Sequence, residues 1–586
     1  MKTVKPKTSN TMSIETGDKK FTINKFIKKS KRIKTTVYWI NEHTIFYTGI
    51  NNYIIKNVNT NEKTKIQIQM MSPVLSPNKK YILYLTIDSQ LNLYEIATNN
   101  IIKINYETNG NLNKIKYIWT SDSEKIVIIS LGNQKSEIYT YDVKNETTDY
   151  IISLEDGSNR NNHIKINDDV IIFVDTDEKT VIYDVNMNTK KSSTIKQFDY
   201  MQQFTNPEIS PDGSKMSIIY DNDSDNFGYL YDMGIITLKN NNIEQITKDI
   251  KWNKIKWLNN YVLIGLRIYG TYTQLYKIDL LDNNTEQLTS GTVRILNFDI
   301  LNNIIVYIGR DTFGNIKIRT LNLNNNKINK IARISVVKNT HFGKVREIRW
   351  NGTYKNMIGL LVYPINYKRN KKYGLMVDIH GGGSVGNMNI YGSVFRGRIP
   401  SEWFIWIQKD VFVFVPEFRS SSIYGSEALL IEDQQKKDII NGDIKDIESG
   451  VDYLISKNLI DENKMIVIGG SAGAQRANWL PVVSNRYRAI ISVDGWNDES
   501  GDQTFKYNPI NYVDKIQTPM LFIMGNPNLG SVDPNYTVKK YYEKLKEYNV
   551  LTEYIYVEDE GHNFYKPENV RNIFGKIFQW IDKYIV

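Results

Sequence analysis

The stretch KMIVIGGSAGAQRANWL, residues 464–480, decides how the second half of this chain is expected to fold. Its apolar start is typical of a buried strand, its small residues are typical of a tight turn, and its remainder is typical of a helix. At such an elbow the backbone of Ser471 is strained, and its hydroxyl projects beyond the carboxyl end of the strand. The spacing Gly469-x-Ser471-x-Gly473 is short enough to occur by chance, so its meaning depends on the rest of the chain.

Residues 336–586 surround this elbow with apolar β-type runs that alternate with helical patterns. YGLMVDIH at 373–380, DVFVFVPEF at 410–418 and PMLFIMG at 519–525 are runs of this kind. Buried strands that alternate with helices indicate a mostly parallel, doubly wound sheet. We therefore predict a C-terminal α/β-hydrolase domain over residues 336–586.

Residues 35–335 contain short β-type runs broken by Asn, Asp and Gly. A period of about 40–45 residues with about four strands in each unit is typical of β-propeller blades. The sequence therefore predicts a β-propeller of about seven blades, and six or eight stay open because the fourth unit is poorly marked. A basic segment, residues 1–34, precedes the propeller and could pack on the hydrolase domain. Similar units begin near Trp39, Ser76, Trp119, Lys165, Ser210, Trp257 and Phe298.

The composition excludes several classes of protein. At 586 residues the chain is too long for one hydrophobic core, and 41% apolar with 24% charged residues is typical of globular proteins. It contains no cysteine, which excludes disulfides, thiolate metal sites and a cysteine nucleophile. No apolar run could span a bilayer, and the basic start has no apolar signal region, so we expect a cytoplasmic protein without a membrane partner.

The net charge of +10 raises the question of a nucleic-acid partner. The lysines accompany no helix-turn-helix, zinc-finger or RNP pattern, so a solvated lysine-rich surface is favoured and no nucleic-acid partner is expected. The chain also lacks HExxH and P-loop patterns. We expect neither a metal nor another cofactor.

A serine nucleophile needs a base, and the chain offers five histidines. His562 follows a predicted strand and precedes the final helix, the place of the base in the hydrolase order Ser–Asp/Glu–His. The acid should follow the strand at 519–525, and Asp533 is the carboxylate in that loop. Its alternative role is to begin the next helix, because Asp-Pro is a common start.

The sequence HGGGS begins at His380, directly after a predicted strand. Successive glycines there allow backbone N–H groups to turn inward and bind an oxyanion. We expect His380 to anchor this turn and not to act as the base. The predicted oxyanion donors are the amides of Gly381, Gly382, Gly383 and Ala472.

The motifs HGGGS, EFRSSSIYGSE, GGSAGA and DEGHNF occur in this order behind a predicted propeller. The chain thereby resembles the prolyl oligopeptidase family of serine peptidases, in particular its dipeptidyl-peptidase and acylaminoacyl-peptidase branches. The resemblance spans nearly the whole chain. It implies cleavage of short peptides, with the propeller excluding folded proteins, and it makes Ser471 the nucleophile and His562 the base.

The resemblance also assigns Arg419 to organising the site or binding substrate carbonyls. Tyr424 and Trp496 could line a substrate pocket, although aromatic residues near a sheet end are more often core. Three positions depart from the family pattern. Ala472 stands in place of a tyrosine, Gly383 replaces a proline, and Asn528 occupies the usual place of the acid.

These observations predict a serine peptidase that cleaves short or unstructured peptides through an acyl-enzyme. One alternative is a carboxylesterase of small acyl substrates, which the HGGG run favours. Another is a catalytically inactive binding protein, because asparagine at position 528 could not stabilise an imidazolium as a carboxylate does and because the family's tyrosine is missing at Ala472. Cleavage from an end or within a chain is left open, as is a homo-oligomer.

Overall fold

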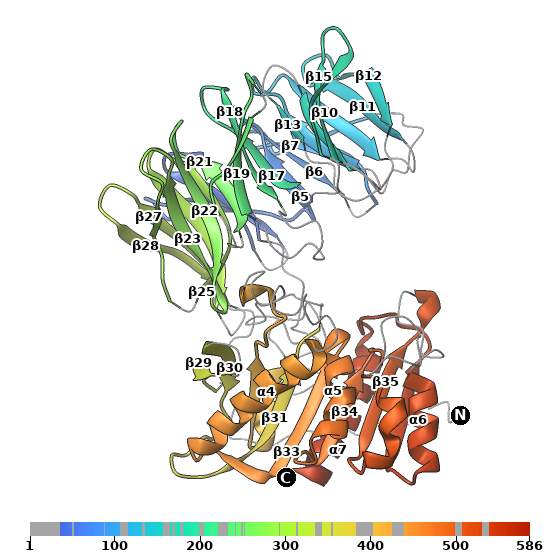
Figure 1. Ribbon diagram of the computed structural model, residues 1–586. Helices are drawn as coiled ribbons and strands as arrows, with labels where there is room; N and C mark the ends of the chain where they lie inside the picture. Colours follow the sequence, from blue (N-terminus) through green and yellow to red (C-terminus); the bar gives the residue numbers. More distant parts are fainter. Residues whose placement is uncertain are drawn as a thin grey trace. The chain divides into compact units, whose positions relative to one another are not determined.

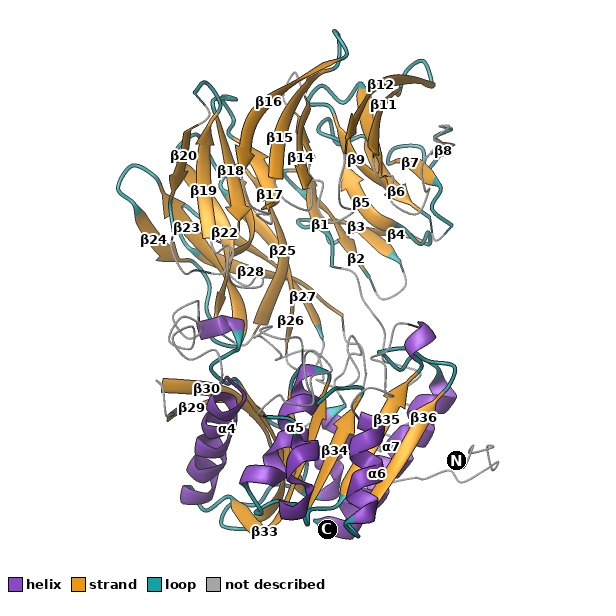
Figure 2. Ribbon diagram, turned by 45° about the vertical axis from the view of Figure 1, so that its right-hand side comes forward, coloured by secondary structure: helices purple, strands orange, loops and turns teal. Residues whose placement is uncertain are grey.

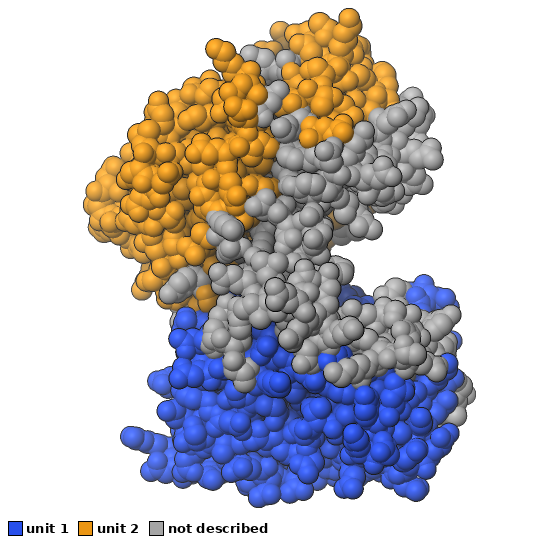
Figure 3. All heavy atoms as spheres, in the orientation of Figure 1, with its two compact units in different colours: residues 1–32, 311–315, 335–586 blue, residues 33–310, 316–334 orange. Residues whose placement is uncertain are grey.

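We describe the chain from a computed structural model. Two compact units are distinguished, one formed mainly by residues 335–586 and the other by residues 33–310 and 316–334 (Figure 3). The basic segment 1–34 lies outside the described residues. The described residues are 35–49, 52–86, 88–105, 115–131, 135–155, 164–166, 170–175, 180–198, 204–220, 232–240, 242–247, 250, 252–291, 293–311, 315–334, 343–352, 356–381, 402–424, 439–497, 507–529 and 538–585.

The first unit along the chain is a β-propeller, as predicted (Figures 1 and 2). Within the described residues it contains seven four-stranded sheets, each formed by four consecutive antiparallel strands. The strands of the first four sheets are β1 (Val37–Asn41), β2 (Thr44–Thr48), β3 (Tyr53–Asn57) and β4 (Lys63–Ile66); β5 (Met71–Leu75), β6 (Tyr81–Leu85), β7 (Leu91–Glu95) and β8 (Ile101–Lys103); β9 (Ile115–Trp119), β10 (Lys125–Leu131), β11 (Lys135–Asp142) and β12 (Thr147–Glu155); and β13 (Ile164–Ile166), β14 (Val170–Asp175), β15 (Thr180–Asn186) and β16 (Lys191–Phe198). Those of the last three are β17 (Phe204–Ile209), β18 (Lys215–Tyr220), β19 (Asp232–Thr237) and β20 (Asn242–Gln245); β21 (Trp252–Trp257), β22 (Val262–Tyr269), β23 (Tyr272–Asp279) and β24 (Asn284–Gln287); and β25 (Val293–Leu301), β26 (Ile304–Asp311), β27 (Ile316–Asn322) and β28 (Lys327–Ile334).

The repeat in the sequence corresponds to these sheets. Each of the seven starting points lies in the first strand of one sheet or directly after it. Apolar clusters join consecutive sheets; for example, Leu83 and Leu93 of the second sheet share a cluster with Ile126 and Ile128 of the third. Each sheet therefore buries its apolar faces against its neighbours, which explains why one repeat cannot fold alone.

Side chains connect the first sheet to the seventh. Asp299 Oδ2 in β25 accepts a hydrogen bond of 2.9 Å from the backbone N–H of Trp39 in β1, and the Trp39 indole donates to Ile304 O at 3.2 Å. Asp299 Oδ1 also lies 2.6 Å from Lys256 Nζ in β21. One carboxylate thus connects three sheets where the ring closes.

The second unit is an α/β-hydrolase domain with the eight-stranded order β29-β30-β32-β31-β33-β34-β35-β36. The pairs β29–β30 and β30–β32 are antiparallel, and the remaining pairs are parallel. The carboxyl ends of the parallel strands therefore share one edge. The strands are β29 (Val345–Asn351), β30 (Asn356–Val362), β31 (Tyr373–Ile379), β32 (Val411–Pro416), β33 (Ile460–Gly470), β34 (Ala489–Val493), β35 (Met520–Gly525) and β36 (Thr552–Val557).

Helices cover both faces of this sheet (Figure 2). One apolar cluster contains residues of α4, α5 and α6, while Trp406 of α2 contacts Phe574 and Phe578 of α7. No described helix is both long and apolar enough to cross a membrane. The helices are α2 (Trp403–Trp406), η1 (Ile407–Lys409), η2 (Ser422–Tyr424), α4 (Ile439–Ser456), α5 (Ala472–Val483), η3 (Pro509–Lys515), η4 (Pro527–Leu529), α6 (Val538–Glu547) and α7 (Pro567–Tyr584).

Candidate active site

Ser471 lies between β33 and α5, on the elbow that the sequence predicts. Its backbone has φ 58° and ψ −127°, a conformation that residues with a side chain rarely adopt. The turn is fixed at both peptide groups. The Ser471 N–H donates to Val493 O at 3.0 Å, and the Ser471 carbonyl accepts from the Ala474 N–H at 2.9 Å. The expected strain at the nucleophile position is therefore present.

Two glycines allow the elbow to pack closely against the end of β31. A Cβ atom on Gly473 would lie 2.1 Å from Ile379 O, and one on Gly381 would lie 2.4 Å from Gly470 O. The same Cβ atom on Gly381 would also lie 2.7 Å from the Ser471 Cβ atom. Any side chain at these two glycines would force the glycine turn away from the nucleophile.

His562 is brought to Ser471 from the loop between β36 and α7. Its Nε2 atom lies 3.1 Å from Ser471 Oγ, within hydrogen-bond distance. The imidazole is half-buried, with 27% of its surface exposed. The two residues are 91 positions apart in the sequence, and both follow carboxyl ends of parallel strands. This is the geometry that a general base needs to remove the serine proton.

Asp494 is the carboxylate that contacts the other ring nitrogen. Its Oδ2 atom is hydrogen-bonded to His562 Nδ1. Its Oδ1 atom accepts a hydrogen bond of 2.8 Å from the Gly525 N–H. The backbone N–H of Asp494 donates to Ile523 O, also at 2.8 Å. The side chain is 2% exposed. Backbone groups of β35 thus hold the carboxylate in place, and it can orient the imidazole and stabilise its charged form.

The prediction that Asp533 orients the imidazole is wrong. Asp533 lies outside the described residues, and the Nδ1 contact belongs to Asp494, directly after β34. The physical reason is the strand order. β34 is the direct neighbour of β33, the strand that ends before Ser471, whereas β35 is one strand further away. A residue at the carboxyl end of β34 is therefore nearer to Ser471 than the loop after β35. Asn528 is exposed in η4, where its N–H donates to Asn526 Oδ1.

A sequence signal for Asp494 exists. AIISVDG, residues 489–495, is a buried strand that ends in an aspartate and a glycine. In the structure Asp494 has φ 47°. The next residue, Gly495, lies close to the elbow, because a Cβ atom on it would be 2.8 Å from Ser471 O. A polar residue in a left-handed turn beside the elbow could have been a second candidate for the acid.

The predicted oxyanion donors are described only in part. Ala472 is buried at the first position of α5, and Gly381 packs on the elbow. Gly382 and Gly383 lie outside the described residues. The donor roles of all four amides stay predictions.

His380 is buried at the start of the glycine turn, and its side chain contacts residues other than Ser471 and His562. Its Nδ1 lies 3.2 Å from Gly381 O, and its Nε2 lies 3.1 Å from Ser421 Oγ and 3.2 Å from Glu417 Oε2. The ring stacks on Phe418 with centroids 4.5 Å apart. These contacts fit the anchoring role expected of it.

Two of the three predicted substrate residues are held by contacts within the domain. Arg419 forms a two-pronged ion pair with buried Asp446, with Nε–Oδ2 at 2.8 Å and Nη2–Oδ1 at 2.9 Å. The Tyr424 hydroxyl accepts from the Ile358 N–H at 2.9 Å and donates to a backbone carbonyl, and burial raises the pKa of this tyrosine. Trp496 is half-buried in the loop after Asp494. Contact of these residues with a substrate stays a prediction.

A second buried ion pair supports the first turn of α5, which follows the elbow. The sequence analysis did not predict this ion pair. Arg476 of α5 binds Asp443 of α4, with Nη2–Oδ2 at 3.0 Å, and its Nη1 donates to Ala472 O at 3.2 Å. The Ser420 hydroxyl donates to the same carboxylate at 2.7 Å. Burial raises the pKa of Asp443, and Arg476 opposes that rise. This network holds the first turn of α5 on which Ser471 depends.

The described residues offer no cluster of three or more His, Asp or Glu side chains that could hold a metal ion. Three side chains meet at the elbow, those of Ser471, His562 and Asp494. A serine on a strained turn, an imidazole at its hydroxyl and a buried carboxylate behind the imidazole are the parts of an activated nucleophile.

Comparisons with known proteins agree with the motifs. Residues 399–505 match the prolyl oligopeptidase family. Dipeptidyl-peptidase 5 of Porphyromonas endodontalis is 20% identical over 344 residues, which cover 53% of this chain and 48% of the relative. Acylamino-acid-releasing enzyme 1 of Oryza sativa subsp. japonica is 25% identical over 255 residues, which cover 38% of this chain and 31% of the relative. The chain thus spans about half or less of the length of these relatives.

Solved structures show the same fold. The acylaminoacyl peptidase of Pyrococcus horikoshii superposes with a TM-score of 0.76 at 14% identity, covering 96% of this chain and 97% of that one. An acylaminoacyl peptidase in complex with Z-Gly-Gly-Phe-chloromethyl ketone superposes with a TM-score of 0.76 at 15% identity. The superposition covers 95% of this chain and 97% of that one. The propeller, the hydrolase sheet, the elbow and the family match together confirm the resemblance of this chain to the prolyl oligopeptidase family.

Proposed function

We propose that this chain is a serine peptidase that cleaves short or unstructured peptides through an acyl-enzyme. The observation that carries the proposal is the position of His562, between Ser471 Oγ at 3.1 Å and the buried Asp494 carboxylate. A serine hydroxyl is a weak nucleophile near neutral pH unless a base of this kind accepts its proton.

In the proposed reaction Ser471 Oγ attacks the substrate carbonyl while its proton passes to His562 Nε2. Asp494 stabilises the imidazolium that forms, and the amides of Ala472 and the glycine turn 381–383 bind the developing oxyanion. His562 then gives the proton to the leaving amine, so that the peptide bond breaks and Ser471 carries the acyl group. Water, deprotonated by His562, releases the acid and restores the serine.

The peptide substrate class is supported by the similar proteins. Their printed names include a dipeptidyl-peptidase and an acylamino-acid-releasing enzyme, and one solved structure holds a peptide chloromethyl ketone. We further propose that the propeller limits the size of the substrates. A cytoplasmic location is supported by the absence of cysteine.

The alternative of a carboxylesterase rests on Gly383, which gives the glycine turn an HGGG sequence. The alternative of an inactive binding protein rests on Asn528 and on Ala472, which stands in place of the family's tyrosine. The contact between Asp494 and His562 argues against the first of these reasons.

The test is labelling with a fluorophosphonate, followed by mass spectrometry of the adduct. We expect one adduct on Ser471, no adduct in Ser471→Ala, slow labelling in Asp494→Asn and an unchanged rate in Asp533→Asn. Absence of labelling in the folded wild-type protein would exclude the proposed activity. Turnover of acyl-dipeptide amides, compared with p-nitrophenyl esters, then separates the peptidase from the esterase, because serine peptidases often cleave activated esters as well.

A further inference from the structure

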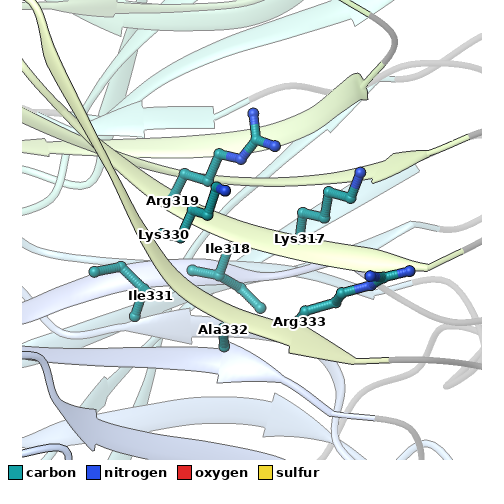
Figure 4. Close-up of a pocket in the computed structure, with 7 residues that line it drawn as sticks. All are labelled: Lys317, Ile318, Arg319, Lys330, Ile331, Ala332 and Arg333. Carbon is teal, nitrogen blue, oxygen red and sulfur yellow. The ribbon is translucent and has the colours of Figure 1, made fainter.

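A pocket of about 450 Å³ on the seventh propeller sheet is lined by residues of β27 and β28 (Figure 4). Two of its cations, Lys317 and Arg319, have interactions within the protein, and Arg319 is hydrogen-bonded to the Tyr307 hydroxyl. The pocket therefore calls for no ligand. By contrast, the loop that carries His562 is held by two side chains to which the proposed mechanism assigns no role.

His562 lies in a connection without helix or strand of its own. Residues 558–566 join β36, which ends at Val557, to α7, which begins at Pro567. Connections of this kind are usually the more mobile parts of a domain, whereas a general base must stay within hydrogen-bond distance of the proton that it removes. We call residues 558–566 the base loop, and its contacts show what holds it.

Asn526 binds the base loop at the end of β35. The last registered pair of β35 and β36 is Gly525 with Val557, so Asn526 lies where the two strands separate. Its backbone N–H donates to Glu560 O at 2.6 Å, and its side-chain Nδ2 donates to Glu558 O at 2.7 Å. One residue thus ties two carbonyls of the base loop to the central sheet, directly before the base.

The same end of β35 also holds the acid. The Gly525 N–H donates to Asp494 Oδ1 at 2.8 Å, and the N–H of the next residue, Asn526, binds the base loop. Because β35 lies between β34 and β36, these two residues reach the acid after β34 and the loop after β36. Consecutive residues of one strand therefore set the spacing between the acid and the base.

Glycines let the base loop lie directly on this backbone. A Cβ atom on Gly525 would lie 2.2 Å from Gly561 O, and one on Gly561 would lie 2.0 Å from Leu529 O at the end of η4. Gly561 is the residue before His562. The base loop therefore packs without intervening side chains on β35 and η4.

Glu560 closes the base loop from within. Its side chain is buried, and its Oε1 atom accepts hydrogen bonds from the N–H groups of Tyr565, at 2.9 Å, and Lys566. The Asn569 side-chain amide donates to the same oxygen at 3.3 Å. These bonds connect the part of the loop before His562 with the part after it. Removal of the carboxylate would leave backbone donors unpaired, which is costly in a buried place.

We propose that Asn526 and Glu560 are positioning residues that hold His562 between Ser471 and Asp494. Asn526 fixes the start of the base loop on β35, and Glu560 fixes the distance between its start and its end. Each acts through the backbone of the base loop. The loop after β35, where the sequence placed the acid, thereby supports the base. This inference rests on the proposed function, in which His562 accepts the serine proton.

The first test variant is Asn526→Asp, which has nearly the same shape. It keeps the Oδ1 atom that accepts from the Asn528 N–H but removes the Nδ2 donor, and its carboxylate repels Glu558 O. The matched control is Asn528→Asp, which puts the same charge on an exposed residue of the same turn.

The second test is a pair of variants at one position. Glu560→Ala removes the acceptor for the two backbone N–H groups, whereas Glu560→Gln keeps an Oε1 atom that can accept both. The matched control is Glu558→Ala, because only the backbone carbonyl of this exposed residue binds Asn526. Rescue by glutamine would show that the acceptor matters and not the charge.

The activity readout is fluorophosphonate labelling of the full chain over a range of reagent concentrations, with thermal unfolding as the test of folding. The maximal labelling rate should fall roughly tenfold or more in Asn526→Asp and Glu560→Ala, since a small displacement of the base is costly. The concentration for half-maximal labelling should not change. Glu560→Gln and both controls should stay within about threefold of the wild-type rate.

A second readout does not depend on hydrolysis. In a Ser471→Ala background, the low-field proton resonance of His562 Nδ1–H reports the hydrogen bond to Asp494, and its loss in His562→Gln assigns it. We expect this resonance to be lost in Asn526→Asp and Glu560→Ala and kept in Glu560→Gln and the controls. An unchanged resonance in the first two variants, or equal losses in Glu560→Gln and Glu560→Ala, would overturn the proposal. Absence of labelling in the wild-type protein would instead overturn the proposed function, because the resonance reports the position of His562 in either case.

Discussion

Replacement of Asp494 by asparagine should remove most of the activity while the fold persists. Asparagine has nearly the same shape, and its amide oxygen can keep the hydrogen bond from the Gly525 N–H, now 2.8 Å long. The amide nitrogen then faces His562 Nδ1 and donates to it. The imidazole must carry its hydrogen on Nε2, which points at Ser471 Oγ and can no longer accept the serine proton.

The magnitude follows from two losses, the wrong tautomer and the missing charge beside the imidazolium. Together they should lower kcat by roughly a thousandfold to ten-thousandfold, which corresponds to about 4–5.5 kcal/mol of transition-state free energy. Asp533→Asn is the matched control, because it makes the same chemical change in the loop where the sequence placed the acid. We expect it to change kcat by less than about twofold.

The assay measures the fluorophosphonate labelling rate and the steady-state hydrolysis of one substrate for all three proteins, with circular dichroism and thermal unfolding as tests of folding. A folded Asp494→Asn protein that keeps more than about a tenth of the wild-type rate would refute the reasoning. A larger loss in Asp533→Asn than in Asp494→Asn would refute it as well.

Three further predictions concern strain, packing and charge. Ser471→Gly should raise the free energy of unfolding by about 1 kcal/mol in urea titrations, because glycine adopts φ 58° without strain; a lower stability would contradict this. Gly381→Ala should slow labelling roughly a hundredfold, because its Cβ atom would lie 2.4 Å from Gly470 O and displace the glycine turn; an unchanged rate would show that the turn can shift freely. Burial would raise the pKa of Asp299, but the nearby Lys256 outweighs this effect and holds the pKa below its ordinary value. The ionised carboxylate therefore stabilises the fold above about pH 4. This contribution is lost as the pH falls through the lowered pKa. Asp299→Asn should therefore cost about 3 kcal/mol at pH 7 and much less near pH 2, and a cost that does not change with pH in calorimetry would contradict the ion pair.

The propeller could be predicted from the sequence because each blade repeats the same local pattern of strands and turns. A strand pattern with turn residues recurs at a nearly constant period, and each sheet buries its faces against the next one. Trp39 and Phe298, which mark the first and last repeats, lie in β1 and β25. The connection of these sheets through Asp299 was not predictable, because it joins residues 260 positions apart and leaves no local pattern.

The sequence alone determined the choice of Ser471 and His562 as the proposed nucleophile and base, and the structure brings the two side chains together. Ser471 is identified by a local motif whose strain comes from neighbouring residues, and His562 by its place before the last helix in a fixed strand order. Only the tertiary structure decided which carboxylate contacts His562. A carboxylate at the end of β34 or in the loop after β35 fits the chain order equally well, and the adjacency of β34 to β33 selects Asp494. Local sequence determines how a turn is built, whereas the choice of partner depends on which strands become neighbours in the sheet.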